Sequence, residues 1–323
     1  MVHFERAPEF LIPGQQLSLA YHYIEGIVLS QSINMANNNL LVVERQTDLG
    51  GFLVGRLLPF RKKRQVGPFT FIDHMGPAQI GNGKYVDVDQ HPHIGLSTLT
   101  YLFEGEIEHR DSMGTVQVIR PGDVGFMTAG NGVTHTERTP QSKRNSEPFT
   151  MQGYQIWVAI PKDQAEMPPQ FEFYRSSAIP TWTSASVTYR LVAGNAFGKS
   201  APLQGFSPLF MVDIFAKKAS TINLHDQLKG EVAFVIVKGE ITTPDGKVRA
   251  GQMLISKTDE QCEICLDDNT QVLLFGGESL SNEPLLMWNF VAYDKQRLKK
   301  AKQDWIDKKF PKVPEDDSYI PFP

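Results

Sequence analysis

Two short stretches of the sequence carry side chains whose types and spacing could bind a metal ion. The first, HPH, contains His91 and His93, and the second, THTE, contains His135 and Glu137. Residues two apart on a β-strand project to the same face, so each stretch can direct two ligand atoms at one point. Two such strands side by side would hold one ion. The spacing therefore predicts a site with three imidazole nitrogens and one carboxylate oxygen.

The ligand types narrow the choice of metal. Neutral imidazoles with one carboxylate suit a divalent first-row metal, whereas Mg²⁺ and Ca²⁺ prefer shells of oxygen. A single histidine on a half-buried strand is more often a structural residue, but two spaced pairs are harder to explain in that way. Five of the eight histidines also lie between residues 74 and 135. We interpret His91, His93, His135 and Glu137 as metal ligands.

Two more histidines of this region are candidates for the pocket. His109, in EHRDSMG, could orient a ligand from outside the metal's own shell or line the cavity, and it could equally be a hairpin residue near the rim. His74, in FIDHMGP, lies at an expected strand end before a turn and is the weaker candidate. We interpret Phe126, Met127 and Trp157 as core residues rather than substrate contacts.

Length and composition indicate a two-domain protein. With 323 residues, of which 41% are apolar, the chain can fill two cores. The net charge of −4 gives no sign of a nucleic-acid-binding surface. One basic run, Arg61 to Arg64, precedes a turn and is interpreted as a solvated loop. We therefore expect no direct contact with nucleic acid.

The cysteines and the N-terminal region give information on the subcellular location. Cys262 and Cys265 form a C-x-x-C with no second pair for zinc and no helix start after it, so we interpret them as ordinary thiols in a reducing compartment. Residues 17–35 are moderately apolar but include His22 and Glu25, which is typical of neither a membrane span nor a signal peptide. The expected location is the cytoplasm, away from membranes.

Short apolar runs rich in β-branched and aromatic residues, separated by Gly, Pro, Asn and Asp, fill the chain from residue 40 to 160. This pattern predicts an all-β sandwich or barrel. Prolines interrupt residues 161–186, after which strand-like runs resume. We predict an N-terminal appendage (1–39), a metal-binding domain (40–165) and a second, metal-free domain (166–323).

The second half repeats part of the first. EGEI and RPGD in the first half align with KGEI and RAGQ in the second, which favours an internal duplication. The second copy has no HxH and no histidine after RAGQ, so only the first copy is expected to hold metal. Residues 293–310 then show apolar positions at helical spacing among lysines, which predicts a surface helix.

These motifs resemble those of a known family. The HxH stretch and the segment from Gly122 to Gly130 resemble the two signatures of the cupin superfamily. More narrowly, HPHIGLSTLTYLFEGEIEHRDSMG, PGDVGFMTAGNGVTHTE, QIWVAIP and the late WNFVA resemble the pirin family over roughly residues 40–310. The resemblance implies two tandem cupin β-barrels, a bicupin, with a C-terminal surface helix. Ile94 departs from the arginine that many relatives carry after HPH.

The resemblance also implies a metal and a reaction. In pirins the metal is usually iron and is bound by the residues that correspond to His91, His93, His135 and Glu137. Iron(II) is therefore the expected cofactor, while Mn, Ni, Cu, Zn and Co remain compatible with the ligands. Some pirins act as flavonol 2,3-dioxygenases, which open the central ring of quercetin with O₂ and release carbon monoxide. A quercetin-like flavonol and O₂ are the expected substrates.

Two questions stay open at the level of sequence. Glu137 can be a permanent ligand or a base that takes the proton of a flavonol hydroxyl. The alternative to an enzyme is an iron-dependent regulatory protein, a transcription cofactor that binds a protein partner without turnover. A cupin isomerase or sugar-binding module, with the metal incidental, is a third interpretation.

Overall fold

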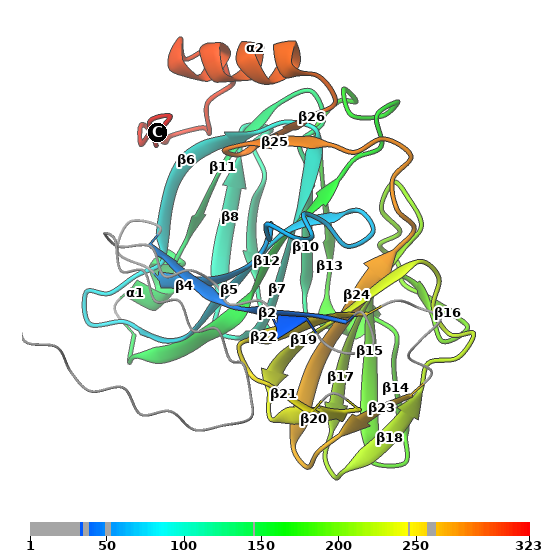
Figure 1. The fold of residues 1–323 in the computed structure, drawn as a ribbon. Helices are drawn as coiled ribbons and strands as arrows, with labels where there is room; N and C mark the ends of the chain where they lie inside the picture. Colours follow the sequence, from blue (N-terminus) through cyan, green and yellow to red (C-terminus); the bar gives the residue numbers. More distant parts are fainter. Residues whose placement is uncertain (1–32, 35–38, 49–52, 145, 245, 257–262) are drawn as a thin grey trace, which may run out of the picture.

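The computed structural model describes residues 33–34, 39–48, 53–144, 146–244, 246–256 and 263–323 (Figure 1). Strands dominate this part of the chain, as predicted, and they form two barrels, each built from a large and a small antiparallel sheet. The short helices are α1 (Gln141–Arg144) and the 3₁₀ turn η1 (Ser176–Ala178), and the longest is α2 (Lys295–Ile306). No helix among the described residues is long and apolar enough to cross a membrane.

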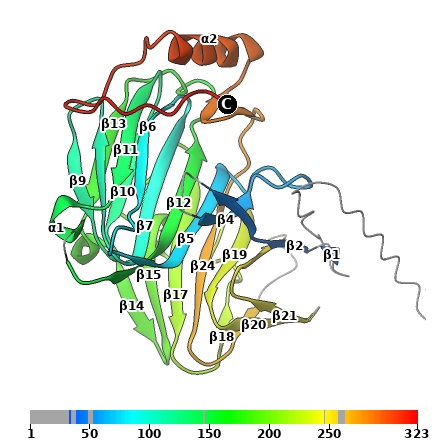
Figure 2. The same cartoon turned by 90° about the vertical axis from the view of Figure 1, so that its left-hand side faces the viewer.

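The first barrel pairs a seven-stranded sheet with a four-stranded sheet (Figure 2). The large sheet has, in order, β13 (Gln170–Tyr174), β10 (Val124–Thr128), β7 (Leu96–Glu104), β12 (Phe149–Ala159), β5 (Phe69–Ile80), β4 (Leu53–Leu58) and β3 (Arg45–Asp48). The small sheet has β6 (Asp87–His93), β11 (Val133–Arg138), β8 (Ile107–Asp111) and β9 (Val116–Ile119).

The second barrel has the same arrangement. Its large sheet runs β1 (Ile33–Asn34), β2 (Leu40–Val43), β22 (Gln252–Ser256), β19 (Glu231–Lys238), β24 (Thr270–Gly277), β17 (Leu209–Ala216), β15 (Val187–Ala196) and β14 (Thr181–Ser184), with β16 (Lys199–Ser200) beside β15. Its small sheet runs β18 (Ser220–Asn223), β23 (Glu263–Leu266), β20 (Glu240–Thr243) and β21 (Gly246–Arg249).

The repeated motifs occupy equivalent places in the two barrels. EGEI and KGEI lie at the turns that follow β7 and β19, and Gly105 and Gly239 there have φ of 83° and 74°. RPGD and RAGQ lie at the turns before β10 and β22, where Gly122 and Gly251 have φ of 77° and 78°. Each position needs the left-handed backbone that glycine adopts without strain. The strand order and these turns both agree with an internal duplication.

Each barrel takes one strand from the other half of the chain. β2 pairs with β22 of the second barrel, although it precedes the first barrel in the chain. β13 pairs with β10 of the first barrel, although it follows residue 166. The predicted boundary at residue 165 stays a prediction, and these two strands pair across it. Most of the predicted appendage lies outside the described residues, but β1 within it pairs with β2.

A shared apolar core joins the barrels. The largest buried cluster takes residues from both halves, and Phe69 and Phe275 meet edge to face with ring centroids 5.0 Å apart. The basic run from Arg61 to Arg64 lies in the loop after β4, where Lys63 pairs with Glu231 of the second barrel. Cys265 is exposed on β23, and Cys262 lies outside the described residues.

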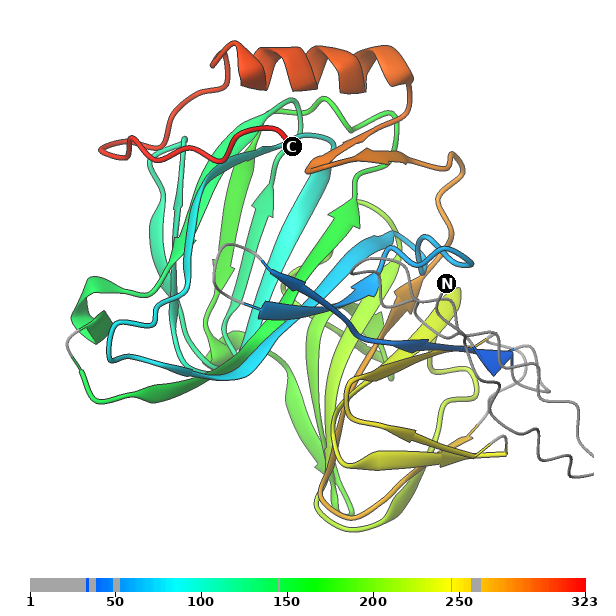
Figure 3. The ribbon, with the colours of Figure 1, turned by 60° about the vertical axis from the view of Figure 1, so that its left-hand side comes forward.

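The C-terminal segment returns to the first barrel. β25 (Leu285–Met287) pairs with β26 (Phe290–Ala292), and Phe290 forms a bridge with Ile94 directly after the HPH stretch. The predicted helix is confirmed as α2, which begins after Asp294, whose side chain accepts from the backbone N–H of Arg297. Leu298, Ala301 and Trp305 bury its apolar face against Phe290 and Ile94. Helix α2 thus covers one end of the first barrel (Figure 3).

Candidate metal centre

Three imidazoles converge inside the first barrel. β6 and β11 are antiparallel neighbours, which places His135 opposite His91 and Val133 opposite His93. One ring nitrogen of each of His91, His93 and His135 lies within 4.8 Å of the other two. The rings are buried, with exposed fractions of 7%, 1% and 0%. This cluster could bind a metal, as the i, i+2 spacing predicted.

Hydrogen bonds fix the tautomers of two of the rings. His91 Nδ1 lies 2.8 Å from the carbonyl oxygen of Asp89, and His93 Nδ1 lies 3.0 Å from that of Asn289. A carbonyl oxygen only accepts, so both Nδ1 atoms carry the proton and both Nε2 atoms keep a free lone pair. His93 Nε2 in turn lies 3.1 Å from His135 Nε2.

The third ring is held by a chain of two further side chains. His135 Nδ1 lies 3.4 Å from His109 Nδ1, and His109 Nε2 lies 3.1 Å from Asp111 Oδ2. The ionised Asp111 carboxylate accepts, so His109 donates from Nε2, and a neutral His109 ring accepts at Nδ1. His135 then donates from Nδ1 and keeps its Nε2 lone pair. All three Nε2 atoms are thereby free to bind one cation.

Burial keeps these rings uncharged. It lowers the pKa of His91 to about 4 and the pKa values of His93 and His135 well below the ordinary value. Charging a ring in a low-dielectric interior is unfavourable, and the neighbouring rings add to this effect. At neutral pH, protons therefore do not compete with a metal for the three nitrogens.

Glu137 lines the same cavity but lies apart from the three-histidine cluster. A bulge in β6 makes Glu137 pair with Val88, three residues before His91, although Glu137 is only two residues after His135. Its carboxylate is hydrogen-bonded by Gln155, while Oε1 is buried without a hydrogen-bond partner. Burial raises the pKa of Glu137 to about 7. An unpartnered carboxylate oxygen in this position is suited to a cation.

The cluster opens into a cavity of about 640 Å³. Phe71 and Trp157 form one wall, stacked with ring centroids 3.9 Å apart, and Trp157 lies edge to face 5.1 Å from His93. Trp157 is buried, as expected for a core residue, and it also lines the cavity. Phe126 is buried in the apolar core that both barrels share, and Met127 is buried in a smaller cluster of the first barrel.

A partly buried ion pair in the cavity wall was not predicted from the sequence. Arg56 donates to Asp73 through Nε and Nη2, at 2.9 and 2.8 Å, and its guanidinium lies 4.5 Å from the centroid of the Phe71 ring. Burial raises the pKa of Asp73 although Arg56 acts against this shift. Seventeen residues separate the partners, and no local pattern relates them.

His74 does not line this cavity. Phe71, Asp73 and Met75 of β5 face it, and the alternation of a strand turns His74 to the other side. There Nδ1 of His74 lies 2.8 Å from Glu44 Oε1, and the ring stacks on Tyr154 with centroids 4.7 Å apart. The structure therefore brings His109 to the histidine cluster and leaves His74 away from it.

The strand order and the histidine cluster between two sheets define a two-barrel cupin. The family models described as Pirin and as the Pirin C-terminal cupin domain match residues 51–158 and 211–311. A "Pirin-like protein" of Caulobacter vibrioides is 41% identical over 290 residues, which cover 88% of this chain and 99% of that protein. The chain belongs to the pirin family.

Solved structures agree with this assignment. A crystal structure of "Quercetin 2,3-dioxygenase" from Acinetobacter baumannii superposes with a TM-score of 0.80 and 32% identity, covering 88% of this chain and 95% of that one. A bacterial pirin of Escherichia coli, solved in complex with nickel(II), shares the fold with a TM-score of 0.57 and 21% identity. It covers 75% of this chain and 100% of that one.

Proposed function

We propose that this protein is an iron(II)-dependent dioxygenase that acts on a quercetin-like flavonol and O₂. Its ligands are His91, His93, His135 and Glu137. The observation that carries the proposal is the convergence of three buried imidazoles, two of which, His91 and His93, line an aromatic cavity that also contains a buried carboxylate. The name of the Acinetobacter relative, 32% identical, supports the same chemistry.

The donor set fits such an ion. Three imidazole lone pairs can supply three ligands, and the unpartnered Oε1 of Glu137, which lies apart from the cluster in this structure, is the proposed fourth. When bound, iron(II) would supply a Lewis-acidic, redox-active centre that favours an ionised flavonol oxygen and leaves positions open for substrate. The protein's own part is to keep the rings neutral and correctly oriented before the metal arrives.

Glu137 can serve as both ligand and base. Its pKa of about 7, raised by burial, lies close to neutral pH, where a general base works best. Gln155 hydrogen-bonds the carboxylate and itself accepts from the Thr100 hydroxyl at 2.8 Å, so the carboxylate is held at the cavity wall. We infer that Glu137 takes the proton of the flavonol hydroxyl as substrate binds.

The cavity suits a flat aromatic substrate. Its volume of about 640 Å³ is within the usual range for small-molecule sites. The stacked Phe71 and Trp157 offer a planar apolar wall, and Arg56 adds a cation beside it. An ionised flavonol would place its rings against the wall and its negative charge toward the cationic side.

The test is oxygen consumption by reconstituted protein. Metal-free protein is loaded with iron(II) without oxygen, quercetin is added, and O₂ is admitted. Both atoms of O₂ enter the products and one ring carbon leaves as carbon monoxide, so one CO is expected per O₂ consumed. His91→Ala should abolish both signals, while His225→Ala, on the exposed surface of the second barrel, should not. Iron-loaded protein that binds quercetin without consuming O₂ would contradict the proposal.

A further inference from the structure

The last twelve residues, 312–323, form a segment that we call the C-terminal strap. The strap lies beyond residue 311, where the family match ends, and it has no helix or strand. After α2 the chain reverses, and the strap runs between α2 and the end of β6 (Figures 2 and 3). Its residues Tyr319, Ile320 and Pro321 line the cavity of the histidine cluster.

Gln90 binds the strap from β6. Its side-chain amide donates to the carbonyl oxygens of Asp316 and Ser318, at 2.7 and 3.0 Å, and its Oε1 accepts from the backbone N–H of Val313 at 2.8 Å. The backbone of Gln90 accepts from the N–H of Ile320 at 3.0 Å. Only 3% of Gln90 is exposed. A buried side chain with this many strap partners holds the segment in one path.

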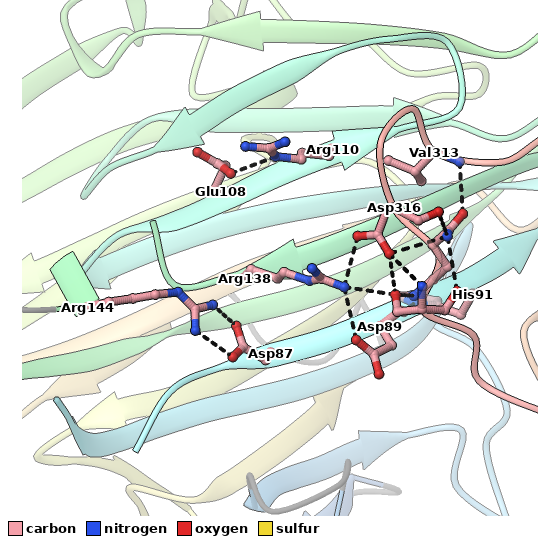
Figure 4. A network of polar contacts seen from close by, with 11 residues as sticks. Asp87, Asp89, His91, Glu108, Arg110, Arg138, Arg144, Val313 and Asp316 are labelled. Atoms are coloured by element: carbon pink, nitrogen blue, oxygen red, sulfur yellow. Dashed lines mark hydrogen bonds and ion pairs between the residues drawn. The ribbon is translucent and has the colours of Figure 1, made fainter. Parts of the chain in front are cut away.

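Arg138 binds the strap from β11 (Figure 4). Its Nη2 lies 2.9 Å from Asp316 Oδ2, 2.8 Å from Ser318 Oγ and 2.9 Å from Asp89 Oδ1. Asp316 also accepts from the backbone N–H of Ser318 at 2.8 Å, which fixes its carboxylate. One guanidinium therefore joins β6, β11 and the strap.

Helix α2 holds the strap from the other side. The ring of Tyr319 stacks on Trp305 with centroids 4.6 Å apart, and Trp305 Nε1 donates to the carbonyl oxygen of Ile320 at 2.9 Å. These contacts fix the residues that line the cavity. The strap is thus held at two sides, by the metal-binding strands and by α2.

The anchors lie next to predicted ligands. Gln90 directly precedes His91, and Arg138 directly follows Glu137. The strands that carry the ligands and the segment that walls the cavity therefore form one hydrogen-bonded unit. The strap residues and the stacked Phe71 and Trp157 line the same cavity, so a ligand in that cavity meets both.

We propose that the C-terminal strap determines specificity: it limits the bulk of the planar aromatic ligands that can reach the metal cluster, with Tyr319 as the main wall residue. The substrate class in this inference rests on the function proposed above. The steric role does not, because any planar metal-binding molecule should meet the same wall.

The test uses two chelators that bind iron(II) through the same two nitrogens but differ in bulk, phenanthroline and bathophenanthroline disulfonate. Iron-loaded full-length protein is mixed with each chelator in the absence of oxygen. The coloured complex of iron(II) with the chelator is followed over time and gives the rate of iron release. We expect the bulky chelator to act roughly tenfold more slowly or worse. Tyr319→Ala, and a chain that ends at residue 311, should bring the ratio of the two rates close to one.

Two neighbouring carboxylates of the strap, Asp316 and Asp317, provide a test variant and its matched control. Asp316→Asn breaks the anchor to Arg138 and should also lower the ratio, whereas the side chain of Asp317 is 99% exposed and Asp317→Asn should leave it unchanged. The point variants keep the test valid where the shortened chain fails to fold. A ratio near one in the full chain, or a ratio that Tyr319→Ala and Asp316→Asn do not move, would overturn the proposal.

Activity provides the second measurement. If the proposed function holds, Tyr319→Ala should raise kcat/KM for a flavonol with a bulky sugar substituent relative to quercetin by about tenfold. Equal losses for both substrates would argue against a role in specificity. Failure of the proposed function appears instead as no O₂ uptake by the full chain, and it leaves the chelator comparison intact.

Discussion

Replacing His109 with alanine should weaken metal binding although His109 is not itself a predicted ligand. The substitution removes the acceptor at 3.4 Å from His135 Nδ1 and leaves a buried donor without a partner. An unsatisfied buried group of this kind costs about 1–3 kcal/mol. Loss of a group that orients a metal-binding histidine usually lowers affinity by about 10–100-fold, which is about 1.4–2.7 kcal/mol. The first figure is the expected loss of folding stability, and the second is the expected loss of metal affinity.

The assay is competition for metal against a coloured chelator, with iron(II) or nickel(II) at pH 7.5. His74→Ala is the matched control. His74 is also a buried histidine of the first barrel with a carboxylate 2.8 Å from its ring, but it does not line the cavity. It should lose stability and keep its affinity for metal. Equal affinities of His109→Ala and the unmodified protein would refute the reasoning.

Asp111→Asn tests the direction of the same hydrogen bonds. Oδ1 of Asp111 accepts from the backbone N–H groups of Met113 and Thr115, at 2.9 and 3.1 Å, so an asparagine must keep its oxygen there. Its amide nitrogen then faces His109 and donates. His109 would donate to His135, which would move its own proton to Nε2 and lose the lone pair that binds metal. We expect a loss of affinity at least as large as that of His109→Ala.

Three further predictions concern Glu137 and the cavity wall. The raised pKa of Glu137, about 7 against the ordinary 4.5, means that metal-free protein loses stability as pH rises from about 4.5 to 7, with no further loss from this group above pH 7. Glu137→Gln should therefore be more stable at pH 8 by about 3 kcal/mol in urea unfolding, with the gain shrinking toward pH 5. If the ionised carboxylate is a ligand, metal affinity should fall by about tenfold for each unit by which the pH is lowered below 7. Glu137→Gln should make this pH dependence weaker in the chelator assay. Trp157→Ala should raise KM for quercetin more than it lowers kcat, because the stacking wall binds substrate and transition state alike; an unchanged KM would contradict the placement of the substrate.

The sequence could predict the histidine cluster because the information is local. His91 and His93 share one strand face by their spacing, and the same holds for His135 and Glu137. The position of Glu137 could not be predicted in full, because the bulge in β6 shifts its partner to Val88. His109 was a candidate without an assigned partner. The register of β11 against β8 places Asp111 opposite His135 and His109 opposite Glu137, and the ring of His109 then meets His135.

Contacts between distant parts of the chain were beyond the sequence. The strap meets the side chain of Gln90 across 223 to 228 residues, and nothing in the composition of either segment relates them. The exchange of β2 and β13 between the barrels is of the same kind. β2 lies in the first half of the chain but pairs in the second barrel, and β13 lies in the second half but pairs in the first barrel. The alternation of residues along a strand predicts which side chains share a face of the sheet. Only the folded structure shows which segments pack against that face.

The division of roles between the barrels follows from one pair of equivalent strands. In the first barrel His91 of β6 lies opposite His135 of β11, while on the equivalent strands of the second barrel Ile222 of β18 lies opposite Ile264 of β23. Both isoleucines are buried in an apolar cluster that fills the second barrel. Burying polar side chains in the first barrel costs free energy unless they are paired or bind a cation. The apolar interior of the second barrel and the core shared by both barrels offset this cost, so a duplicated fold can keep one barrel hollow for chemistry while the other stabilises it.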